Sequence, residues 1–340
     1  MKMTSHSKRT PSSPTMSVLL AVTRHSRSPT TLIVFSFLSM VALGLLLHHF
    51  TGTMLRQHFP TQLCQAHGAN TTVVVAVRTK PNNRSHREAI RKSMGHPMVR
   101  ATLPWKVVFY MGYSADIVRS RSLRREVLKG DLIIAPYEAS FENTIDIFMS
   151  AVRWIHDQCA PAMHHLVHTN DTTMVDFLAA HEHIEGLQEA EDRHFHCAVV
   201  QLARVDRNPN SSLYVPEALF RDTYWPTHCE GDAFIVHSKH LKPLVLSSEA
   251  IAQYPLLGPY VTGHLPVLAR IGHRNITSRI RRLGAAPENQ SFQRPIFVSN
   301  VTEKFQWKAQ WLKTLVCYAD ANNTGMAERI LRKVKFHTAD

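Results

Sequence analysis

Carboxylates are missing from the first quarter of this 340-residue chain, in which the first acidic residue is Glu88. Charge of either sign is missing from residues 32–47, an almost wholly apolar run. With its flanks the run approaches the roughly 20 residues that a membrane-spanning helix needs. Five basic residues precede it: Lys2, Lys8, Arg9, Arg24 and Arg27. Because basic segments stay in the cytosol, we expect a cytosolic tail over 1–31, a signal anchor over 32–50 and a lumenal remainder.

The end of the apolar run also lacks the small residues of a signal-peptidase site, which argues against a cleaved secretory leader. A buried helix of a soluble protein and a mitochondrial presequence are two other interpretations. The asparagines argue against both, because eight of the twelve stand in Asn-X-Ser/Thr after the run, where chance gives about two. The eight are Asn70, Asn83, Asn170, Asn210, Asn275, Asn289, Asn300 and Asn322. We therefore expect a glycosylated lumenal domain.

No two of the five cysteines have Cys-x-x-Cys spacing, so a zinc site has little support. The His-rich pieces between residues 164 and 197 also lack a second ligand group at metal-site spacing, so scattered surface histidines are the more common explanation. Lumenal cysteines form persistent disulfides. The odd number leaves at least one cysteine unpaired or bonded to another chain, and the pairing stays open. The cysteines are Cys64, Cys159, Cys197, Cys229 and Cys317.

The formal charge of the chain is +13 at neutral pH. Residues 51–130 carry much of it, because fourteen Lys and Arg side chains there face only Glu88, Asp116 and Glu126. Such a bias is compatible with nucleic acid, a membrane surface or an anionic small substrate. A lumenal domain does not meet nucleic acid. We therefore expect a phosphate-bearing substrate or, in the simpler case, a solvated basic face.

Residues 51–70 are polar without clear periodicity and are expected to form a stem. After them, buried strands alternate with amphipathic helices. Strands are predicted at 73–77, 105–112, 131–134 and 164–168, and helices at 87–94 and 141–159. The alternation predicts a lumenal domain over 71–340 with an α/β, doubly wound, mostly parallel sheet flanked by helices. Ligands of such sheets bind at the carboxyl ends of the strands, so the polar residues 169–172 are a candidate site.

Six short segments between residues 72 and 275 carry recognisable motifs. They are 87–95 (Arg-Glu-Ala-Ile-Arg-Lys-Ser-Met-Gly), 109–112, Glu126 with 130–133, 140–143 with Trp154 and Cys159, 226–231, and 254–263. In order and spacing they resemble the β-1,3-galactosyltransferase and β-1,3-N-acetylglucosaminyltransferase family of Golgi type II enzymes. The segment 226–231, for example, is similar to that family's Pro-x-Tyr-Cys-x-Gly motif, with His228 at the Tyr position. Each motif alone is weak, but six in order behind a predicted anchor are specific.

This resemblance implies a GT-A fold, a UDP-sugar donor, a divalent metal (usually Mn²⁺) and inversion at the anomeric carbon. In the family an Asp-x-Asp-type cluster after the fourth strand holds the metal that bridges the diphosphate. Here Asp171 stands at that place, with Asn170 and Thr172 at the other acidic positions. Donor contacts are expected from Arg87, Arg91, Asp131 and His168. A second carboxylate takes the proton from the acceptor hydroxyl.

The chain departs from the family pattern at both acidic sites. Asp171 is the one carboxylate left in the metal cluster, and Asn170 has become a glycosylation sequon. Gly258 and Pro259 stand where the family has the acidic pair that supplies the base. The nearest other candidates for the base are Glu230 and Asp232, for which an ordinary polar turn is the alternative.

Two hypotheses therefore stay open. In the first, the chain is a Golgi membrane glycosyltransferase that transfers a hexose or N-acetylhexosamine in β-1,3 linkage to a glycan on a glycoprotein or glycolipid. Asp171 would hold a weakened metal, or Arg87, Arg91 and His168 would supply positive charge at the diphosphate. In the second, the domain keeps the fold without catalysis and serves an active glycosyltransferase as partner, chaperone or sugar-binding subunit. Family resemblance favours the first, and the altered site favours the second, because a general base contributes about 10²–10⁴ in rate.

Overall fold

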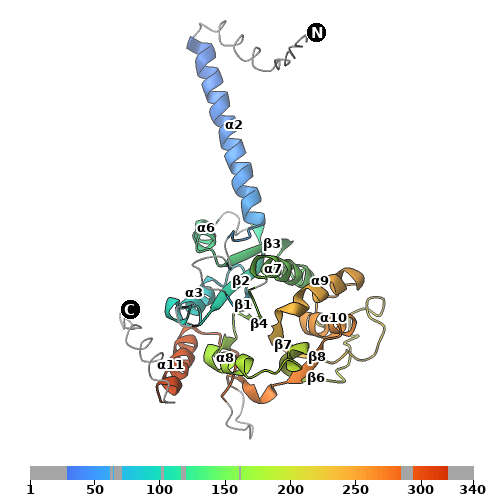
Figure 1. Cartoon of the computed structure of the whole chain (residues 1–340). Coiled ribbons are helices and arrows are strands. Elements are labelled where there is room, and N and C mark those ends of the chain that lie inside the picture. Colours follow the sequence, from blue (N-terminus) through green and yellow to red (C-terminus); the bar gives the residue numbers. More distant parts are fainter. Residues whose placement is uncertain are drawn as a thin grey trace, which may run out of the picture. The chain divides into compact units, whose positions relative to one another are not determined.

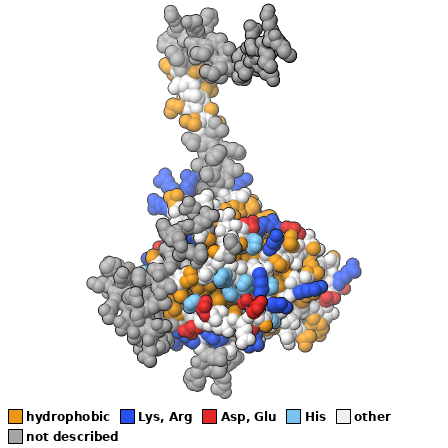
Figure 2. Space-filling model, in the orientation of Figure 1, with side chains coloured by type: hydrophobic (Ala, Val, Ile, Leu, Met, Phe, Trp, Pro, Cys, Tyr) orange, Lys and Arg blue, Asp and Glu red, His pale blue; other side chains and the backbone are white. Residues whose placement is uncertain are grey.

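The computed structural model describes residues 29–61, 64, 71–100, 103–115, 120–160, 162–284 and 294–320. They belong to two compact units, Met1–Thr53 and Met54–Asp340. Helix α2 (Pro29–Arg56) covers the predicted apolar run (Figure 1). Its described side chains, those of residues 33–45 and Arg56, are exposed, and those of 33–45 are mostly apolar (Figure 2). Within the described residues no helix is long and apolar enough to cross a membrane, so the anchor over 32–50 stays a prediction.

The second unit is built on a seven-stranded sheet with the order β3-β2-β1-β4-β7-β6-β8 (Figure 1). Strands β3, β2, β1 and β4 pair in parallel, β7 is antiparallel to both of its neighbours, and β6 is parallel to β8. The strands are β1 (Val73–Arg78), β2 (Trp105–Tyr113), β3 (Leu132–Glu138), β4 (His165–Asn170), β6 (His194–Val200), β7 (His228–His237) and β8 (Gly272–Asn275). The predicted α/β architecture with a mostly parallel sheet is confirmed.

Strand β1 separates two hydrophobic cores, because successive side chains of a strand point to opposite faces. Val73, Val75 and Val77 belong to the core that includes α3 (Arg84–Lys92), α8 (Phe177–Glu185) and α11 (Lys304–Asp320). Val74 and Ala76 belong to the core that includes α7 (Thr144–Cys159), α9 (Leu241–Ala250) and α10 (Leu265–Ala269). A continuous apolar run is what a strand buried on both faces requires, which is why this strand was predictable.

The remaining elements are short. They are the α-helices α4 (Pro97–Arg100) and α6 (Arg121–Val127), the 3-10 helices η1 (Glu191–Arg193), η2 (Ser238–His240) and η4 (Thr277–Arg279), and the π-helix η3 (Gly258–His264). Strands β5 (Met174–Val175), β10 (Phe297–Ser299) and β9 (Ile280–Arg282) form a second sheet. Local chemistry fixes several boundaries. Asp176, for example, caps α8 by accepting a hydrogen bond from the Ala179 N–H at 3.1 Å.

Two disulfides form in the second unit, and the sequence did not predict their pairing. Cys64 bonds to Cys159 at the end of α7, and Cys197 on β6 bonds to Cys229 on the adjacent β7. Part of the predicted stem also joins the fold, because His58 forms an antiparallel bridge with Ile134 of β3. The two disulfides are typical of an oxidising compartment.

Candidate functional site

The carboxyl edge of the parallel strands brings two turns together. In the register of β1 against β4, Arg78 lies beside Asn170, and both strands end there. The residues after β1 (79–83) and after β4 (171–172) therefore meet at one edge. This is the edge where ligands of α/β sheets bind.

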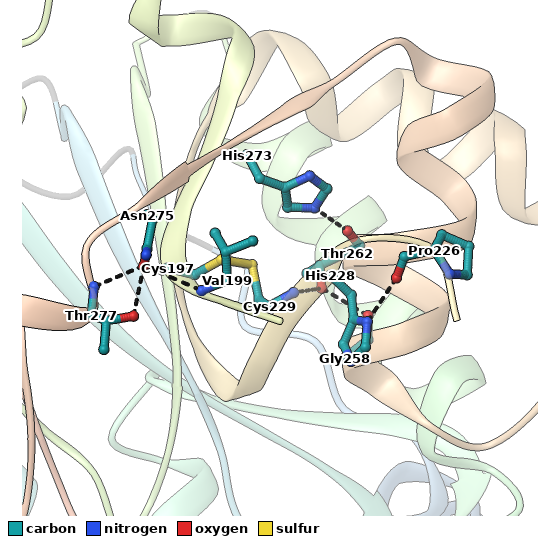
Figure 3. Close-up of a disulfide and its surroundings, with 10 residues drawn as sticks. All are labelled: Cys197, Val199, Pro226, His228, Cys229, Gly258, Thr262, His273, Asn275 and Thr277. Carbon is teal, nitrogen blue, oxygen red and sulfur yellow. Dashed lines mark hydrogen bonds between the residues drawn. A yellow bond between two sulfur atoms is a disulfide. The ribbon is translucent and has the colours of Figure 1, made fainter. Parts of the chain in front are cut away.

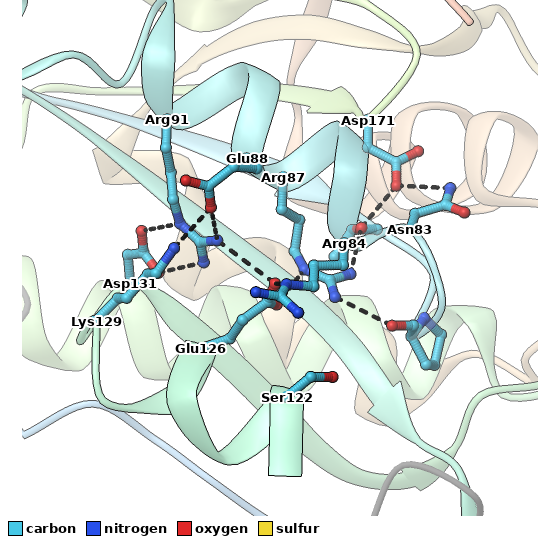
Figure 4. A network of polar contacts seen from close by, with 12 residues as sticks. Asn83, Arg84, Arg87, Glu88, Arg91, Ser122, Glu126, Lys129, Asp131 and Asp171 are labelled. Atoms are coloured by element: carbon cyan, nitrogen blue, oxygen red, sulfur yellow. Dashed lines mark hydrogen bonds and ion pairs between the residues drawn. The ribbon is translucent and has the colours of Figure 1, made fainter. Parts of the chain in front are cut away.

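Asp171 connects these two turns. Its side chain is 5% exposed, and its Oδ2 accepts hydrogen bonds from Thr79 Oγ1 at 2.6 Å and Asn83 Nδ2 at 2.9 Å (Figure 4). Asn170 Oδ1 accepts from the N–H of Thr172 at 3.0 Å and from its hydroxyl at 2.9 Å. The three predicted metal-site residues thus lie in one hydrogen-bonded turn.

This turn does not fit the Mn²⁺ site that the family resemblance implies. One oxygen of Asp171 is already an acceptor for two protein donors. Among the residues that the structure describes, no group of three His, Cys, Asp or Glu side chains is placed to hold a metal ion. Hard divalent cations need several oxygen ligands, and the described side chains supply one carboxylate here.

Arg87 is fully engaged with the protein. It is 1% exposed and donates from Nε to Glu126 Oε2 at 2.7 Å (Figure 4). Its Nη1 donates to Thr79 Oγ1 and to the Lys80 carbonyl, and its Nη2 donates to the Pro81 carbonyl. The guanidinium therefore fixes the turn that follows β1. All three guanidinium nitrogens are engaged and the side chain is buried, so it is placed as a support of the turn and not as a diphosphate contact.

Arg91 and Asp131, also predicted donor contacts, bond to each other. The Nε and Nη2 of Arg91 donate to the two carboxylate oxygens of Asp131, each at 2.8 Å. The guanidinium also lies over the ring of Phe109, with 4.8 Å to its centroid. The bidentate geometry anchors α3 to the segment before β3.

His168 lies inside the sheet and not at its edge. It is 0% exposed, and its Nε2 is 2.6 Å from the hydroxyl of Tyr110. Its ring stacks on Phe234 at 4.6 Å and meets Phe148 edge-on at 5.1 Å. A side chain in this position contributes to the core and does not touch a ligand at the edge.

Glu230 and Asp232 lie within β7 and not in the expected polar turn, because the antiparallel strand extends over residues 228–237. The sequence did not predict this strand, since its polar and apolar residues do not form a continuous run. Glu230 is exposed and pairs with Arg282 at 3.3 Å. The side chain of Asp232 is outside the described part of the structure.

Gly258 and Pro259 begin the π-helix η3, which packs against the start of β7. A Cβ on Gly258 would lie 2.8 Å from the Cys229 carbonyl oxygen, so the backbone leaves no space for a carboxylate side chain. Thr262 fixes the contact: its hydroxyl donates to the Gly258 carbonyl at 2.7 Å and accepts from the Cys229 N–H at 2.9 Å (Figure 3). The loss of the acidic pair is thus accommodated by close packing.

His228, to which the sequence pattern assigned no role, lies beside this contact (Figure 3). It occupies the aromatic position of the 226–231 motif, where the family resemblance expects Tyr. Its Nδ1 is 2.8 Å from the Pro226 carbonyl oxygen, and burial lowers the pKa of its imidazole although that hydrogen bond opposes the shift. A histidine in place of tyrosine within a recognised motif was the available signal.

The described sequon asparagines lie in different environments. Asn210, Asn275 and Asn300 are exposed, whereas Asn83 is half-buried and donates to Asp171. Asn275 accepts hydrogen bonds from the N–H and hydroxyl of Thr277 (Figure 3). Asn70, Asn289 and Asn322 lie outside the described residues. Glycosylation at all of these positions stays a prediction.

Comparison with known proteins places the chain in a family. The model of the galactosyltransferase family matches residues 85–277. Human "Beta-1,3-galactosyltransferase 9" is 22% identical over 177 residues, which are 52% of this chain and 47% of that protein. "UDP-GlcNAc:betaGal beta-1,3-N-acetylglucosaminyltransferase 8" of Mus musculus is 23% identical over 190 residues, 54% of this chain and 47% of that protein.

A third relative is "Lactosylceramide 1,3-N-acetyl-beta-D-glucosaminyltransferase A" of Danio rerio, 25% identical over 173 residues, 48% of this chain and 45% of that protein. The chain thus spans about half the length of the curated relatives it matches. The low identities fit a divergent member. Because the family model covers more than half of the chain, including α3, β4, β7 and η3, this chain belongs to the galactosyltransferase family.

Proposed function

We propose that this chain is a β-1,3-glycosyltransferase that moves a hexose or N-acetylhexosamine from a UDP-sugar to a glycan on a glycoprotein or glycolipid. The observation that carries the proposal is the family match over residues 85–277, which contains β4 and residues 171–172 of the carboxyl edge described above. The names of the relatives supply the linkage and the two candidate sugars, galactose and N-acetylglucosamine. The basic segment 51–130 suits an anionic donor.

The reaction needs three things from the protein. The donor must be positioned, the negative charge on the leaving UDP must be stabilised, and a base must take the proton of the attacking hydroxyl. Asp171, Thr79 and Asn83 form the turn at which we place the donor. Because the described side chains do not fit a Mn²⁺ site, the proposal assigns no step to a metal.

We further propose that the protein resides in the Golgi as a single-span type II membrane protein with its enzymatic domain in the lumen. The acid-free basic tail, the uncharged run and the eight sequons support this orientation. The two disulfides agree with it. Protease protection of the domain in intact microsomes, together with a mobility shift after deglycosylation, tests the topology. Cleavage of the domain in intact vesicles would contradict it.

The direct test of the function is UDP binding by calorimetry to the full chain in detergent, followed by transfer from UDP-galactose and UDP-N-acetylglucosamine to glycan acceptors and lactosylceramide. We expect binding that changes little with Mn²⁺. Asp171→Ala should weaken it about tenfold or more, because a buried charged acceptor organises the turn. Asp157→Ala is the matched control, since that carboxylate is 61% exposed on α7. A chain that binds no UDP would instead be the catalytically inactive partner subunit.

A further inference from the structure

We propose that His228 is the general base of this transferase, and that its Nε2 removes the proton from the acceptor hydroxyl. The inference rests on the transfer reaction proposed above and assigns its proton-accepting group. The described residues offer no unpaired carboxylate as a base at these positions. Gly258 and Pro259 of η3 stand at the expected acidic positions, and Glu230 is exposed and paired with Arg282 at 3.3 Å. A transfer to a hydroxyl needs another acceptor for the proton.

The topology places His228 at the required edge. Strand β7 is antiparallel to β4, with Phe234 opposite His168. The first residues of β7 therefore extend past the carboxyl end of β4, toward the side where Asn170 and Asp171 lie. His228 is the first residue of β7, so its backbone belongs to the same edge as the proposed donor turn.

The hydrogen bond of the ring fixes the tautomer. A carbonyl oxygen only accepts, so the contact of 2.8 Å with the Pro226 oxygen requires the proton on Nδ1 of His228. In the neutral ring Nε2 then carries a lone pair. Among the described residues none forms a hydrogen bond with that nitrogen. This is the arrangement by which proteins orient a catalytic imidazole: one nitrogen is held by the backbone and the other is left for chemistry.

Residues of η3 pack closely against His228. Residue His228 is 7% exposed, so its orientation is fixed by neighbours. A Cβ on Gly263 would lie 3.1 Å from His228 Cβ, and a Cβ on Gly258 would lie 3.7 Å from His228 Cδ2. Both glycines of η3 therefore lie against this residue, and Figure 3 shows Gly258 beside the ring. The Cys197–Cys229 disulfide holds the next residue of the strand.

The protonation state agrees with the role. Burial lowers the pKa of His228, which keeps the imidazole neutral near pH 7. Its titratable neighbour is His273 on β8, whose Nε2 donates to the Thr262 carbonyl and whose pKa is lowered mainly by burial and partly by His228. In the reaction the acceptor O–H bond breaks and its proton moves to Nε2. The oxygen forms the bond to the anomeric carbon, the bond from that carbon to the phosphate oxygen breaks, and UDP leaves with the electron pair.

The test uses the full chain and hydrolysis of UDP-galactose or UDP-N-acetylglucosamine, in which water replaces the unidentified acceptor. We expect His228→Ala to lower kcat about 10²–10⁴-fold while the affinity for UDP changes less than about twofold. Added imidazole should restore part of the rate, because it can enter the space of the deleted ring. His228→Tyr, which keeps an aromatic side chain, should fold and bind UDP but show the same loss.

The pH profile separates chemistry from packing. Wild-type kcat should fall as the pH drops through the pKa of His228, because protonation removes the lone pair, and this acidic limb should disappear in the residual activity of His228→Ala. His273→Asn is the matched control and should keep the wild-type kcat. Wild-type rates in His228→Ala and His228→Tyr, or a loss without imidazole rescue and with an unchanged pH profile, overturn the role of His228. A wild-type chain that neither binds nor turns over the donor overturns the transferase function itself.

Discussion

Two regions at the same edge of the sheet differ: the turn after β1, held by Arg87, and the start of β7, where His228 lies. Both side chains are buried, at 1% and 7% exposure. They differ in how those side chains are satisfied. Each nitrogen of the Arg87 guanidinium donates to a protein oxygen (Figure 4), whereas the His228 ring has a described partner at Nδ1 only (Figure 3). Buried polar groups are normally satisfied. Arg87 is thus held as a support of the fold, whereas His228 keeps one ring nitrogen without a described partner at the edge where we place the reaction.

Two arginines of a recognised motif are both bound within the fold. Arg87 and Arg91 both belong to a recognised motif, yet both bond to carboxylates of the fold, Glu126 and Asp131. Membership of a motif therefore does not distinguish a ligand contact from a scaffold contact. The bonds that hold each side chain within the fold distinguish them, and the following substitutions test that distinction.

The largest effect is expected for Arg87→Ala. It leaves the Glu126 carboxylate, 1% exposed, without its partner at 2.7 Å. Removal of one member of a buried ion pair costs about 3–5 kcal/mol, and urea unfolding followed by tryptophan fluorescence measures it. Arg84→Ala is the matched control: Arg84 also faces Glu126, at 3.5 Å, but is 56% exposed, so its loss should cost no more than about 1 kcal/mol. Equal losses of unfolding free energy in the two variants would contradict the role of Arg87 as a buried support of the fold.

The next largest effect is expected from loss of the Cys197–Cys229 disulfide, whose Cys229 follows His228 in β7. The double variant Cys197→Ala, Cys229→Ala should lose about 2–4 kcal/mol of unfolding free energy. It should also lower donor hydrolysis, because Cys229 holds the residue next to the proposed base. The comparator is Cys64→Ala, Cys159→Ala, which removes the other disulfide. That variant should lose comparable unfolding free energy, but its folded fraction should keep the wild-type kcat. An equal fall in kcat would contradict a specific role of the Cys197–Cys229 disulfide in positioning His228.

A smaller effect is expected for Gly258→Ala. Its new Cβ would lie 2.8 Å from the Cys229 carbonyl oxygen, which is backbone and cannot move aside easily. Overpacking of this kind costs about 1–3 kcal/mol, and the shift should move the His228 ring and lower kcat. Gly130→Ala is the control, because nothing lies within 4 Å of its Cβ and its cost comes from a φ of +69° alone, about 1 kcal/mol. A wild-type kcat in Gly258→Ala would show that η3 does not position the ring.

The sequence predicted the elements whose burial has a simple period. The run 73–77 is apolar throughout because β1 is covered on both faces, and the strand was predictable from that pattern alone. The predicted strand 131–134 continues to Glu138, and the predicted helix 87–94 already begins at Arg84. The end of the strand depends on a contact with another segment, the pairing of Glu138 with Tyr113 of β2, which no local pattern contains.

The site was less predictable, because its chemistry depends on partners distant in the sequence. The motif positions of Arg87, His168 and Asp171 were identifiable, but their surroundings were not: Glu126 is 39 residues from Arg87, and Thr79 is 92 residues from Asp171. The absence of a carboxylate at residues 258 and 259 was visible in the sequence. That a histidine 30 residues earlier lies beside Gly258 follows only from the packing of η3 on β7.

His165 is a buried histidine without a chemical role, and its substitution should have the smallest effect on the free energy of unfolding at neutral pH. His165, 6% exposed, has no hydrogen-bond partner at either ring nitrogen, and its nearest carboxylate is Asp192 at 3.5 Å. Burial, helped by His237, lowers the pKa of its imidazole to about 4 although Asp192 opposes this. An unfolded histidine titrates near 6.5, so between about pH 6.5 and 4 the unfolded chain binds more protons. The free energy of unfolding should therefore fall as the pH drops through that range.

His165→Phe should flatten this dependence of the unfolding free energy on pH, measured by urea unfolding at several pH values. The data at pH 7.5 serve as the control for packing. An unchanged slope would mean that other buried histidines, such as His183 with its pKa lowered to about 4, carry the pH dependence.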